Sequence, residues 1–405
     1  MNGSSPSING SHPAANHTNE KPNGKPMTIF DAVAARIPSR AALAVKLMTK
    51  YRDSPIHEVT VENVMNGMRG LPCILWEISE SSATGVRHHG KTLTELEELL
   101  PKWPGSTVMS PEAMLWFLYT AEIPTPSEVQ AFSGRHLPSC RNTFGSPNLL
   151  RQFAERYLAR VPTLANGISK DELWKYALED ALDVTGRFPM LVGSIYAKAY
   201  GIAQNTAFLP SSDADLAHNF ARQIGKDNDA DFVEFTRLCW SFYMDHGTSV
   251  SSHAMRLVSS AWTEPYTTIA TGLIGGTGPL HAKAIADSVK FNLNVLSTLG
   301  ADPSKEEILA YVHSLLSLIR NMNDNVPELL RERVRGMKNP HPNGDALNGC
   351  ILYAYGLPSD YLLSFFACSR AMGFMTQCVW DRALGLPMER PLSLTMDELL
   401  AKVQS

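Results

Sequence analysis

Apolar residues recur at helical spacing along most of this 405-residue chain. In the segment 92–100 they form a single stripe that follows the threonine and glutamate of a capping box. The segment 110–124 opens with a serine followed by a proline, which is typical of a helix N-terminus. The segment 304–319 again combines a capping box with an apolar face. We therefore predict helices over all three segments.

Two further segments complete the pattern. The segment 361–385 is apolar nearly all round and ends on a glycine, as expected of a buried central helix. Arg370 interrupts it, so no apolar stretch reaches the roughly 18 residues that a membrane span needs. Alternating strand patterns are scarce, and the best of them, at 71–79, predicts only a short hairpin. The fold class is therefore mainly α, with a large helical body.

Composition narrows the class of protein. Apolar residues make up 44% of the chain and charged residues 19%, as in an ordinary globular protein, and the length favours more than one domain. The net charge of −4 gives no electrostatic reason to expect a nucleic-acid or membrane partner. The six cysteines lack the paired spacing of a metal site, so we expect reduced thiols and no metal.

The first 26 residues are rich in Asn, Ser, Gly and Pro and contain almost no large apolar side chains. Such a segment cannot bury enough surface to offset its ordering entropy, so we predict a disordered tail. It contains no arginine, no amphipathic pattern and no apolar signal segment, and the chain does not end in a peroxisomal signal. These features lead us to expect a cytoplasmic protein.

Five residues are candidates for chemistry. His281 falls where a glycine-rich turn meets a predicted helix, His246 precedes a flexible Gly-Thr-Ser segment, and Asp345 lies in a Pro/Gly/Asn loop. Each has a structural alternative, since a lone cap histidine or a turn aspartate usually satisfies only local backbone. Arg370 and Arg390 suggest a ligand rich in carboxylates, because a buried guanidinium needs an anionic partner. An internal Asp or Glu would serve that need equally well.

Read together, these stretches resemble citrate synthase of the eukaryotic type, from about Ile29 to Val403. The order and spacing of the last block are the most diagnostic part of the resemblance. The matching pieces are "VENVMNGMRGLPCILWEIS" (61–79), "GVRHHGKTL" (85–93), the block 245–281 with "SSAWTEPYTTIATGLIGGTGPLH", "KNPHPNGDALNG" (338–349) and "SRAMGFMTQCVWDRALGLPMERP" (369–391).

The resemblance implies a two-domain helical fold and a homodimer with shared active sites. Residues 27–277 and 366–405 would form the large helical domain, and residues 278–365 a small domain that is shortened relative to the family. The implied substrates are an acyl-CoA and oxaloacetate, with no separate cofactor.

The resemblance also assigns roles to the five residues. His281 would help convert the acyl group into an enol or enolate, and Asp345 would remove its α-proton. A neutral imidazole at a helix N-terminus suits that role, because the positive end of the dipole disfavours protonation. His246 would contact oxaloacetate. Arg370 and Arg390 would hold the dicarboxylate and the product, the second from the partner subunit.

One block of the family pattern is absent. Family members carry a PGYGH-type loop and an LRxxDPR motif that supply a second catalytic histidine, a further arginine and part of the CoA site. Here only 64 positions separate His281 from Asp345, and neither motif occurs between them. His313 lies in the wrong motif, whereas His341, four residues before Asp345, is a candidate for a compensating role. The family region near residues 134–155 is also altered.

Two functional hypotheses follow. The first is an acyltransferase that joins an acyl-CoA to oxaloacetate and yields citrate or an alkylcitrate in a specialised, secondary metabolic pathway; a methylcitrate synthase is a variant of it. The second is a catalytically impaired homologue that dimerises or binds carboxylates without turnover. For the absent block, loss in a paralogue and an incorrectly assembled coding sequence are both open.

Overall fold

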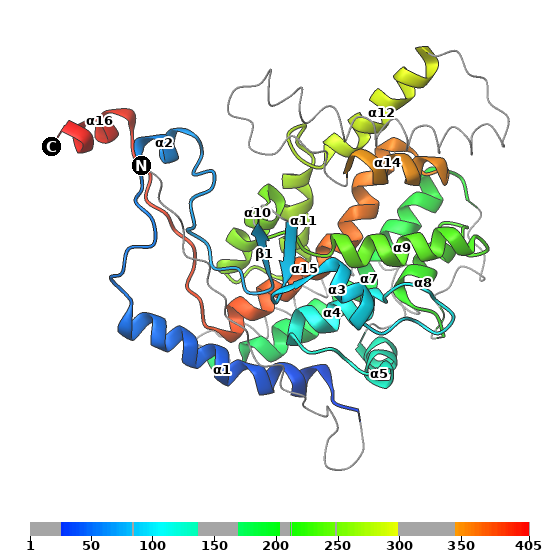
Figure 1. Ribbon diagram of the computed structural model, residues 1–405, viewed down its shortest axis with the longest axis horizontal. Helices are drawn as coiled ribbons and strands as arrows, with labels where there is room; N and C mark the ends of the chain where they lie inside the picture. Colours follow the sequence, from blue (N-terminus) through cyan, green and yellow to red (C-terminus); the bar gives the residue numbers. More distant parts are fainter. Residues whose placement is uncertain are drawn as a thin grey trace.

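The structure is a computed structural model that describes residues 26–82, 85–136, 169–202, 211, 213–247, 249–298 and 345–404. The described chain is predominantly helical, with one small three-stranded sheet, which confirms the mainly α class (Figure 1). The predicted tail, apart from Pro26, and the helix predicted over 304–319 lie outside the described residues.

The first half of the described chain contains one long helix, the small sheet and several short helices. The elements are α1 (Ile29–Lys50), α2 (Val61–Met65), β1 (Ser79–Ser82), β2 (Gly85–His88), β3 (Lys91–Thr92), α3 (Leu93–Leu99), α4 (Pro111–Thr120) and α5 (Pro126–His136).

The second half supplies most of the helical body. The elements are the 3₁₀ turn η1 (Lys170–Glu172), α7 (Leu173–Ala199), α8 (Leu216–Gln223), α9 (Ala230–Tyr243), α10 (Val250–Ser260), α11 (Pro265–Gly276), α12 (Lys283–Thr298), α14 (Asp345–Ala354), the 3₁₀ turn η3 (Ser359–Tyr361), α15 (Leu362–Ala383) and α16 (Met396–Gln404).

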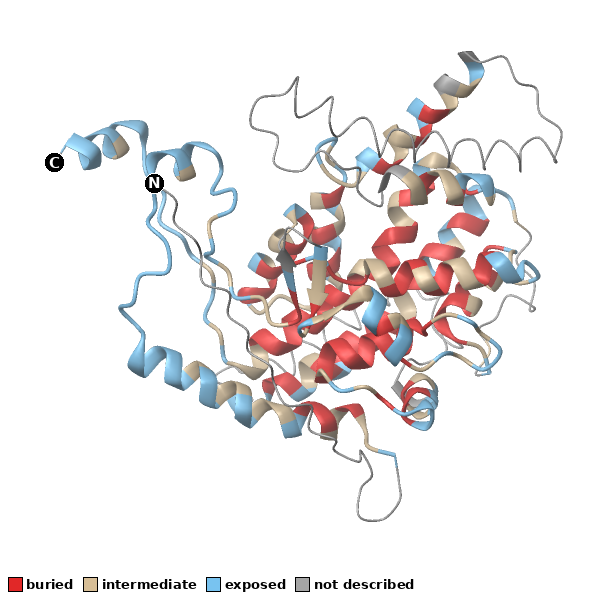
Figure 2. Ribbon diagram, in the orientation of Figure 1, coloured by how far each residue is buried: buried red, intermediate tan, exposed pale blue. Residues whose placement is uncertain are grey.

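Helix α15 lies at the centre of the body, as predicted for 361–385, and 17 of its 22 residues are buried. It packs against α7, α10, α9, α4, α11 and α12 (Figures 1 and 2). The segment Ser359–Ala383 is long and apolar enough to cross a membrane, but 83% of its most apolar window is buried inside the protein. Its apolar character is therefore that of a core helix.

The capping signals read from the sequence are confirmed. Thr92 accepts a hydrogen bond from the Glu95 N–H while the Glu95 carboxylate accepts one from the Thr92 N–H, so both halves of the capping box are present. Ser110 caps α4, with proline at its first position. Helix α4 ends at Thr120 rather than at residue 124, because Ala121 adopts a left-handed conformation with φ of 59°.

The strand predicted over 71–79 is wrong for most of its length, since β1 begins only at Ser79. The preceding segment makes its bonds to helices and loops instead of to a neighbouring strand. The Glu77 N–H donates to the Gln377 Oε1 at 2.9 Å, and the Trp76 indole donates to Asp245 at 3.0 Å. A backbone donor used by a side chain is not available to a strand ladder.

Two adjacent histidines fix the β2 end of the sheet inside the body. His89 Nε2 donates to the Leu118 carbonyl at 2.8 Å, so its Nδ1 accepts from the Arg36 guanidinium at 3.2 Å. Burial, followed by the Arg36 charge, lowers the pKa of His89 to about 3. Burial also lowers the pKa of the fully buried His88 to about 4. Both imidazoles are therefore neutral at physiological pH.

The loop between α9 and α10 lies directly on α15 at Gly373. A Cβ atom at this glycine would overlap the Met244 carbonyl oxygen and would lie 2.9 Å from the Asp245 Cβ. Only glycine permits this approach of loop backbone to helix. Gly373 thus sets the distance between α15 and the loop that carries His246.

Helices α12 and α14 pack together at one end of the body (Figure 1) and lie in the predicted small domain, which also includes η3 and the first turn of α15. Residues 299–344 between them lie outside the described part of the chain. The division into a large domain of 27–277 and 366–405 and a small domain of 278–365 stays a prediction.

Substituting Gly373→Ala tests the contact between α15 and the loop. The added methyl group has no space, so the free energy of unfolding should fall by about 1–3 kcal/mol or more. The control is Gly134→Ala in α5, where nothing lies within 4 Å of the new Cβ and alanine should stabilise by about 0.5–1 kcal/mol. Urea unfolding of both variants measures the contrast, and equal effects would contradict it.

Substituting His89→Gln tests the neutral buried imidazole. The unfolded chain takes up a proton below the ordinary histidine pKa of 6.5, whereas native His89 does so only near pH 3. The stability that His89 contributes is complete above pH 6.5 and is lost as the pH falls toward 3. The stability advantage of the wild type over the variant should therefore shrink by about 1.4 kcal/mol per pH unit between pH 6 and pH 4. Urea unfolding at three pH values measures it, and a constant difference would refute the assignment.

Candidate active site

His281 lies in the turn between α11 and α12, two residues before the first residue of α12. Its N–H donates to the Gly278 carbonyl at 3.0 Å, and its carbonyl accepts from the Ala284 N–H at 3.0 Å. The prediction that this histidine stands at a helix start is confirmed.

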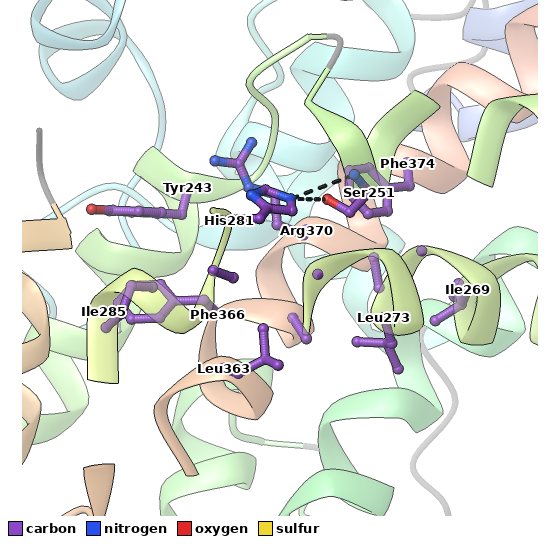
Figure 3. A pocket seen from close by; sticks show the side chains of 15 residues that line it. Tyr243, Ser251, Ile269, Leu273, His281, Ile285, Leu363, Phe366, Arg370 and Phe374 are labelled. Atoms are coloured by element: carbon purple, nitrogen blue, oxygen red, sulfur yellow. Dashed lines mark hydrogen bonds between the residues drawn. The ribbon is translucent and has the colours of Figure 1, made fainter. Parts of the chain in front are cut away.

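The His281 ring contacts the N-terminus of a second helix, α10. The Ser251 backbone N–H donates to His281 Nε2 at 3.4 Å, and the Ser251 Oγ lies 2.8 Å from the same nitrogen (Figure 3). Both contacts are satisfied by the tautomer with a lone pair on Nε2 and the proton on Nδ1, because a backbone N–H can only donate. The positive ends of two helix dipoles further disfavour a second proton. The arrangement favours a neutral imidazole whose Nδ1–H is its donor.

Arg370 of α15 is partly buried and lines the same cavity as His281. Its guanidinium carbon lies 5.9 Å from the centre of the Tyr243 ring, within cation–π range. The Tyr243 hydroxyl accepts a hydrogen bond from the Asn348 amide at 2.8 Å. Tyr243 therefore joins the arginine of α15 to the first turn of α14.

Asp345 is the first residue of α14, and its side chain lies outside the described part of the structure. The start of α14 can still be located relative to the cavity, because Asn348 lies about one turn further along the same helix. The bond from Asn348 to Tyr243 holds the start of α14 beside the cavity wall. The helix end that carries the proposed base is thus tied to the cavity wall through Tyr243.

His246 is exposed in the loop between α9 and α10, and it is not among the residues that line the cavity. Its neighbour Asp245 is buried and accepts hydrogen bonds from Trp76 at 3.0 Å, from the Gly247 N–H at 3.1 Å and from the Ser79 hydroxyl. These bonds fix the backbone on both sides of His246. Sequence reasoning missed the anchoring role of Asp245, although it immediately precedes His246.

His88 interacts electrostatically with Arg370 on α15 and with Asp245 and His246 in the loop between α9 and α10. Besides burial, the charges of Arg370 and His246 lower its pKa, and the Asp245 carboxylate opposes them. Neither ring nitrogen of His88 makes a hydrogen bond with good geometry, and its contact with the Ile78 backbone is only a weak one. A neutral imidazole adds no second positive charge near Arg370. No local pattern in the sequence indicated this role.

Arg390 does not line the cavity of its own chain. It is exposed in the segment after α15, where the preceding residue is firmly held. The Glu389 carboxylate forms an ion pair with Arg256 and lies within hydrogen-bond distance of His253 Nε2, at 3.2 Å, and the Glu389 N–H donates to Ser260 at 3.0 Å. The chain is therefore pinned to α10 just before Arg390 turns away from the body.

The cavity itself has a volume of about 90 Å³ and opens between α11, α15 and the start of α12. Figure 3 shows His281, Arg370 and Ser251 along one side and apolar side chains along the other. A neutral hydrogen-bond donor and a guanidinium at the edge of an apolar cavity suit a ligand that combines a carbonyl, carboxylates and an apolar part. Among the described residues, no three His, Cys, Asp or Glu side chains gather closely enough to hold a metal ion.

Solved structures share this fold. Citrate synthase from Thermoplasma acidophilum, in a ternary complex with carboxymethyl coenzyme A and oxaloacetate, superposes with a TM-score of 0.61 at 15% identity. It covers 82% of this chain and 95% of that one. Citrate synthase from Thermotoga maritima gives a TM-score of 0.55 at 17% identity, with 82% and 95% coverage. At these identities the likeness establishes the fold alone.

Relatives with named activities are closer in sequence. Mitochondrial citrate synthase from Aspergillus niger is 31% identical, over 92% of this chain and 90% of its own. Mitochondrial 2-methylcitrate synthase from Emericella nidulans is 32% identical, over 90% and 92%. The first alignment spans 431 residues, more than the 405 of this chain, so that relative carries residues with no counterpart here. This agrees with the absent block noted in the sequence.

These relatives contradict the expected cytoplasmic location, because both are named as mitochondrial proteins. That expectation rested on the lack of arginine in the first 26 residues. The same segment contains four serines and a single acidic residue, Glu20, and these are features that transit peptides share. The absence of arginine was therefore too weak a signal to exclude a mitochondrial protein.

The family model described as "Citrate synthase, C-terminal domain" matches residues 67–317 and 305–392. Its two segments meet at 305–317, where the sequence lacks the family block. Together they cover more than half of the chain and include all five residues singled out from the sequence. The chain belongs to the citrate synthase family.

Proposed function

We propose that this protein condenses an acyl-CoA with oxaloacetate and releases citrate or an alkylcitrate. The observation that carries the proposal is the neutral His281, whose Nε2 accepts from the α10 N-terminus at the edge of a cavity that also holds Arg370. No cofactor is needed beyond the acyl-CoA substrate. The named activities of the relatives from Aspergillus niger and Emericella nidulans support the same reaction class.

The reaction follows from these groups. The Asp345 carboxylate removes a proton from the carbon next to the thioester carbonyl, while the His281 Nδ1–H hydrogen-bonds the thioester oxygen and stabilises the enolate. The enolate carbon attacks the ketone carbon of oxaloacetate, forming the new C–C bond; the resulting alkoxide takes a proton from water, and Asp345 returns its proton to solvent. Water then cleaves the thioester and gives a carboxylate and free coenzyme A. Arg370 binds a carboxylate throughout.

Two narrower statements belong to this proposal. We assign the reaction to the mitochondrion, following the relatives, and to a specialised, secondary pathway in which an alkyl chain longer than that of acetyl-CoA is transferred. The apolar lining of the cavity beside His281 supports the second statement.

The active unit is proposed to be a homodimer. Two arms, residues 51–75 and 386–404, run away from the helical body and are exposed over most of their length (Figures 1 and 2). Apolar side chains on the arms would be left in water in a single chain, and a second copy would cover them. The most exposed are Ile56, Val59, Met65, Leu392, Met396 and Val403. Arg390 lies on the second arm and would reach the partner's site.

A second candidate function is carboxylate binding without turnover. It is favoured by the absent block, because losing a preorganised donor to an oxyanion lowers the rate by about two to three orders of magnitude. Calorimetric binding of oxaloacetate without thiol release from any acyl-CoA would select this candidate over the enzyme.

Substituting His281→Ala tests the enolising role. The variant loses the donor to the thioester oxygen, so kcat should fall by about 10²–10⁴-fold. Thiol release from acyl-CoA in the presence of oxaloacetate measures it. The matched control is His218→Ala on α8, which is not among the cavity-lining residues and should retain wild-type activity. Equal activity of the two variants would rule out the assignment.

Co-expression of His281→Ala and Arg390→Ala chains tests whether Arg390 acts on the partner's site. Each variant alone should be nearly inactive. In a random mixture half of the dimers are mixed, and each mixed dimer has one site with both groups intact, so about one quarter of wild-type activity should return. Gel filtration confirms the dimers. Failure of the mixed preparation to exceed either parent would contradict the sharing of the site.

A further inference from the structure

A second cavity lies at the C-terminal end of α15 and shares no lining residue with the cavity beside His281. Its volume is about 440 Å³, against about 90 Å³ for the cavity beside His281, and this is within the range of cavities that bind small molecules. The start of α7, the end of α10 and the turn after α15 form its walls. None of the five residues singled out from the sequence lines it.

Trp262, in the wall of the second cavity, has a backbone conformation that its side chain opposes. It follows the last turn of α10 with φ of 63°, and its N–H donates to the Ser259 carbonyl at 2.8 Å. Helices commonly end on a glycine in this left-handed region, because a bulky side chain is strained there. Strained residues of this kind cluster at binding and catalytic sites. The indole of Trp262 therefore points to a function for the cavity that it lines.

Two positive charges lie against the Trp262 ring. The Lys170 Nζ lies 5.8 Å from a ring centre of this indole, and the Arg382 guanidinium carbon lies 6.0 Å from one. Both side chains line the second cavity. Each cation is attracted to the face of the ring, but the ring carries no net charge that could neutralise it. The electrostatic complement of this wall is an anion.

The acidic residue in the lining does not serve as that complement. The Asp381 side chain is buried, and its carboxylate pairs with Arg256 at 3.2 Å and accepts from the Gln377 amide at 2.8 Å. Arg382 donates to the Ser259 carbonyl, which is a neutral acceptor. Within the described part of the chain, neither Lys170 nor Arg382 forms an ion pair. Both charges thus remain for a ligand.

The second cavity also lies at the base of the arm that carries Arg390. Its wall includes the turn 385–388, in which Gly385 has a φ of 62° and ends α15. The next residue, Glu389, donates its N–H to Ser260, which is itself in the lining. A molecule bound in the cavity would therefore contact the segment from which the arm leaves the helical body.

We propose that the second cavity binds a small anion with two or more acidic groups, held between Lys170 and Arg382 against the Trp262 indole. Lysine and arginine both bind phosphate and carboxylate groups, so the ligand is defined by the chemistry that a phosphate compound and a polycarboxylate share. The site is separate from the condensation and does not depend on the proposed function.

The test is calorimetric titration of the full-length protein with inorganic pyrophosphate and, separately, with tricarballylate. At least one of the two should bind, and the tighter one identifies whether phosphate or carboxylate groups are preferred. Its Kd should rise with salt concentration, because Lys170 is exposed and its charge is screened. Absence of binding by both anions would overturn the proposal.

Lys170→Gln removes one of the two charges and keeps a side chain of similar length. The Kd of the anion should rise by about tenfold or more, as expected for the loss of a charge-assisted contact. The matched control is Lys226→Gln, at a lysine that lies 5.7 Å from the Phe232 ring centre and lines neither cavity. It should bind as the wild type does. Equal affinities of the two variants would place the anion elsewhere, including at Arg370, and overturn the proposal.

Trp262→Gly tests the indole. Glycine accepts the left-handed backbone, so the end of α10 should be kept, whereas the ring that holds both cations is lost. Urea unfolding confirms the fold, and Kd should again rise; wild-type affinity would overturn the proposal. If this variant does not fold, the exposed Lys170 decides. Loss of the dimer in Lys170→Gln on gel filtration, with no anion bound by the wild type, would assign the cavity to a subunit contact instead.

Discussion

The contact between Gly373 and the Met244 carbonyl is the constraint on which the site depends. Arg370 lies one turn before Gly373 on the buried α15, and His246 lies two residues after Met244 on the loop. Because helix and loop backbone touch directly, the distance between the guanidinium and the loop is fixed by main chain. Asp245 then fixes the loop on its other side through Trp76 and Ser79. The end of the site at which a dicarboxylate is proposed to bind is thus built on backbone contact.

At the other end of the site, where the acyl group is proposed to bind, His281 depends on the direction of a hydrogen bond. The Ser251 N–H presents a donor to His281, and a donor admits only an unprotonated ring nitrogen. His88 and His89 are kept neutral by burial, whereas His281 is held neutral by this bond while still exposed to a substrate. The protein therefore maintains a neutral imidazole beside Arg370, although unperturbed histidine titrates close to physiological pH.

Sequence patterns predicted those parts of the structure that are encoded locally. The α15 core helix, the caps of α3 and α4 and the helix start at His281 follow from apolar periodicity and capping residues over a few turns. The strand at 71–79 failed because Glu77 and Trp76 bond to residues about 300 and 169 positions away. Ser251, Asp245 and His88 were missed for the same reason, since their roles arise only where distant segments meet.

The C-terminal end of α11 carries Gly272, Gly275 and Gly276 within five residues and leads directly into the turn that holds His281. A helix end so rich in glycine opens locally at a small fraction of the free energy of global unfolding. Its amide hydrogens should consequently exchange with solvent far sooner than those of α15. Of the two helices that border the cavity, α11 should thus be the less protected at this end and α15 the more rigid.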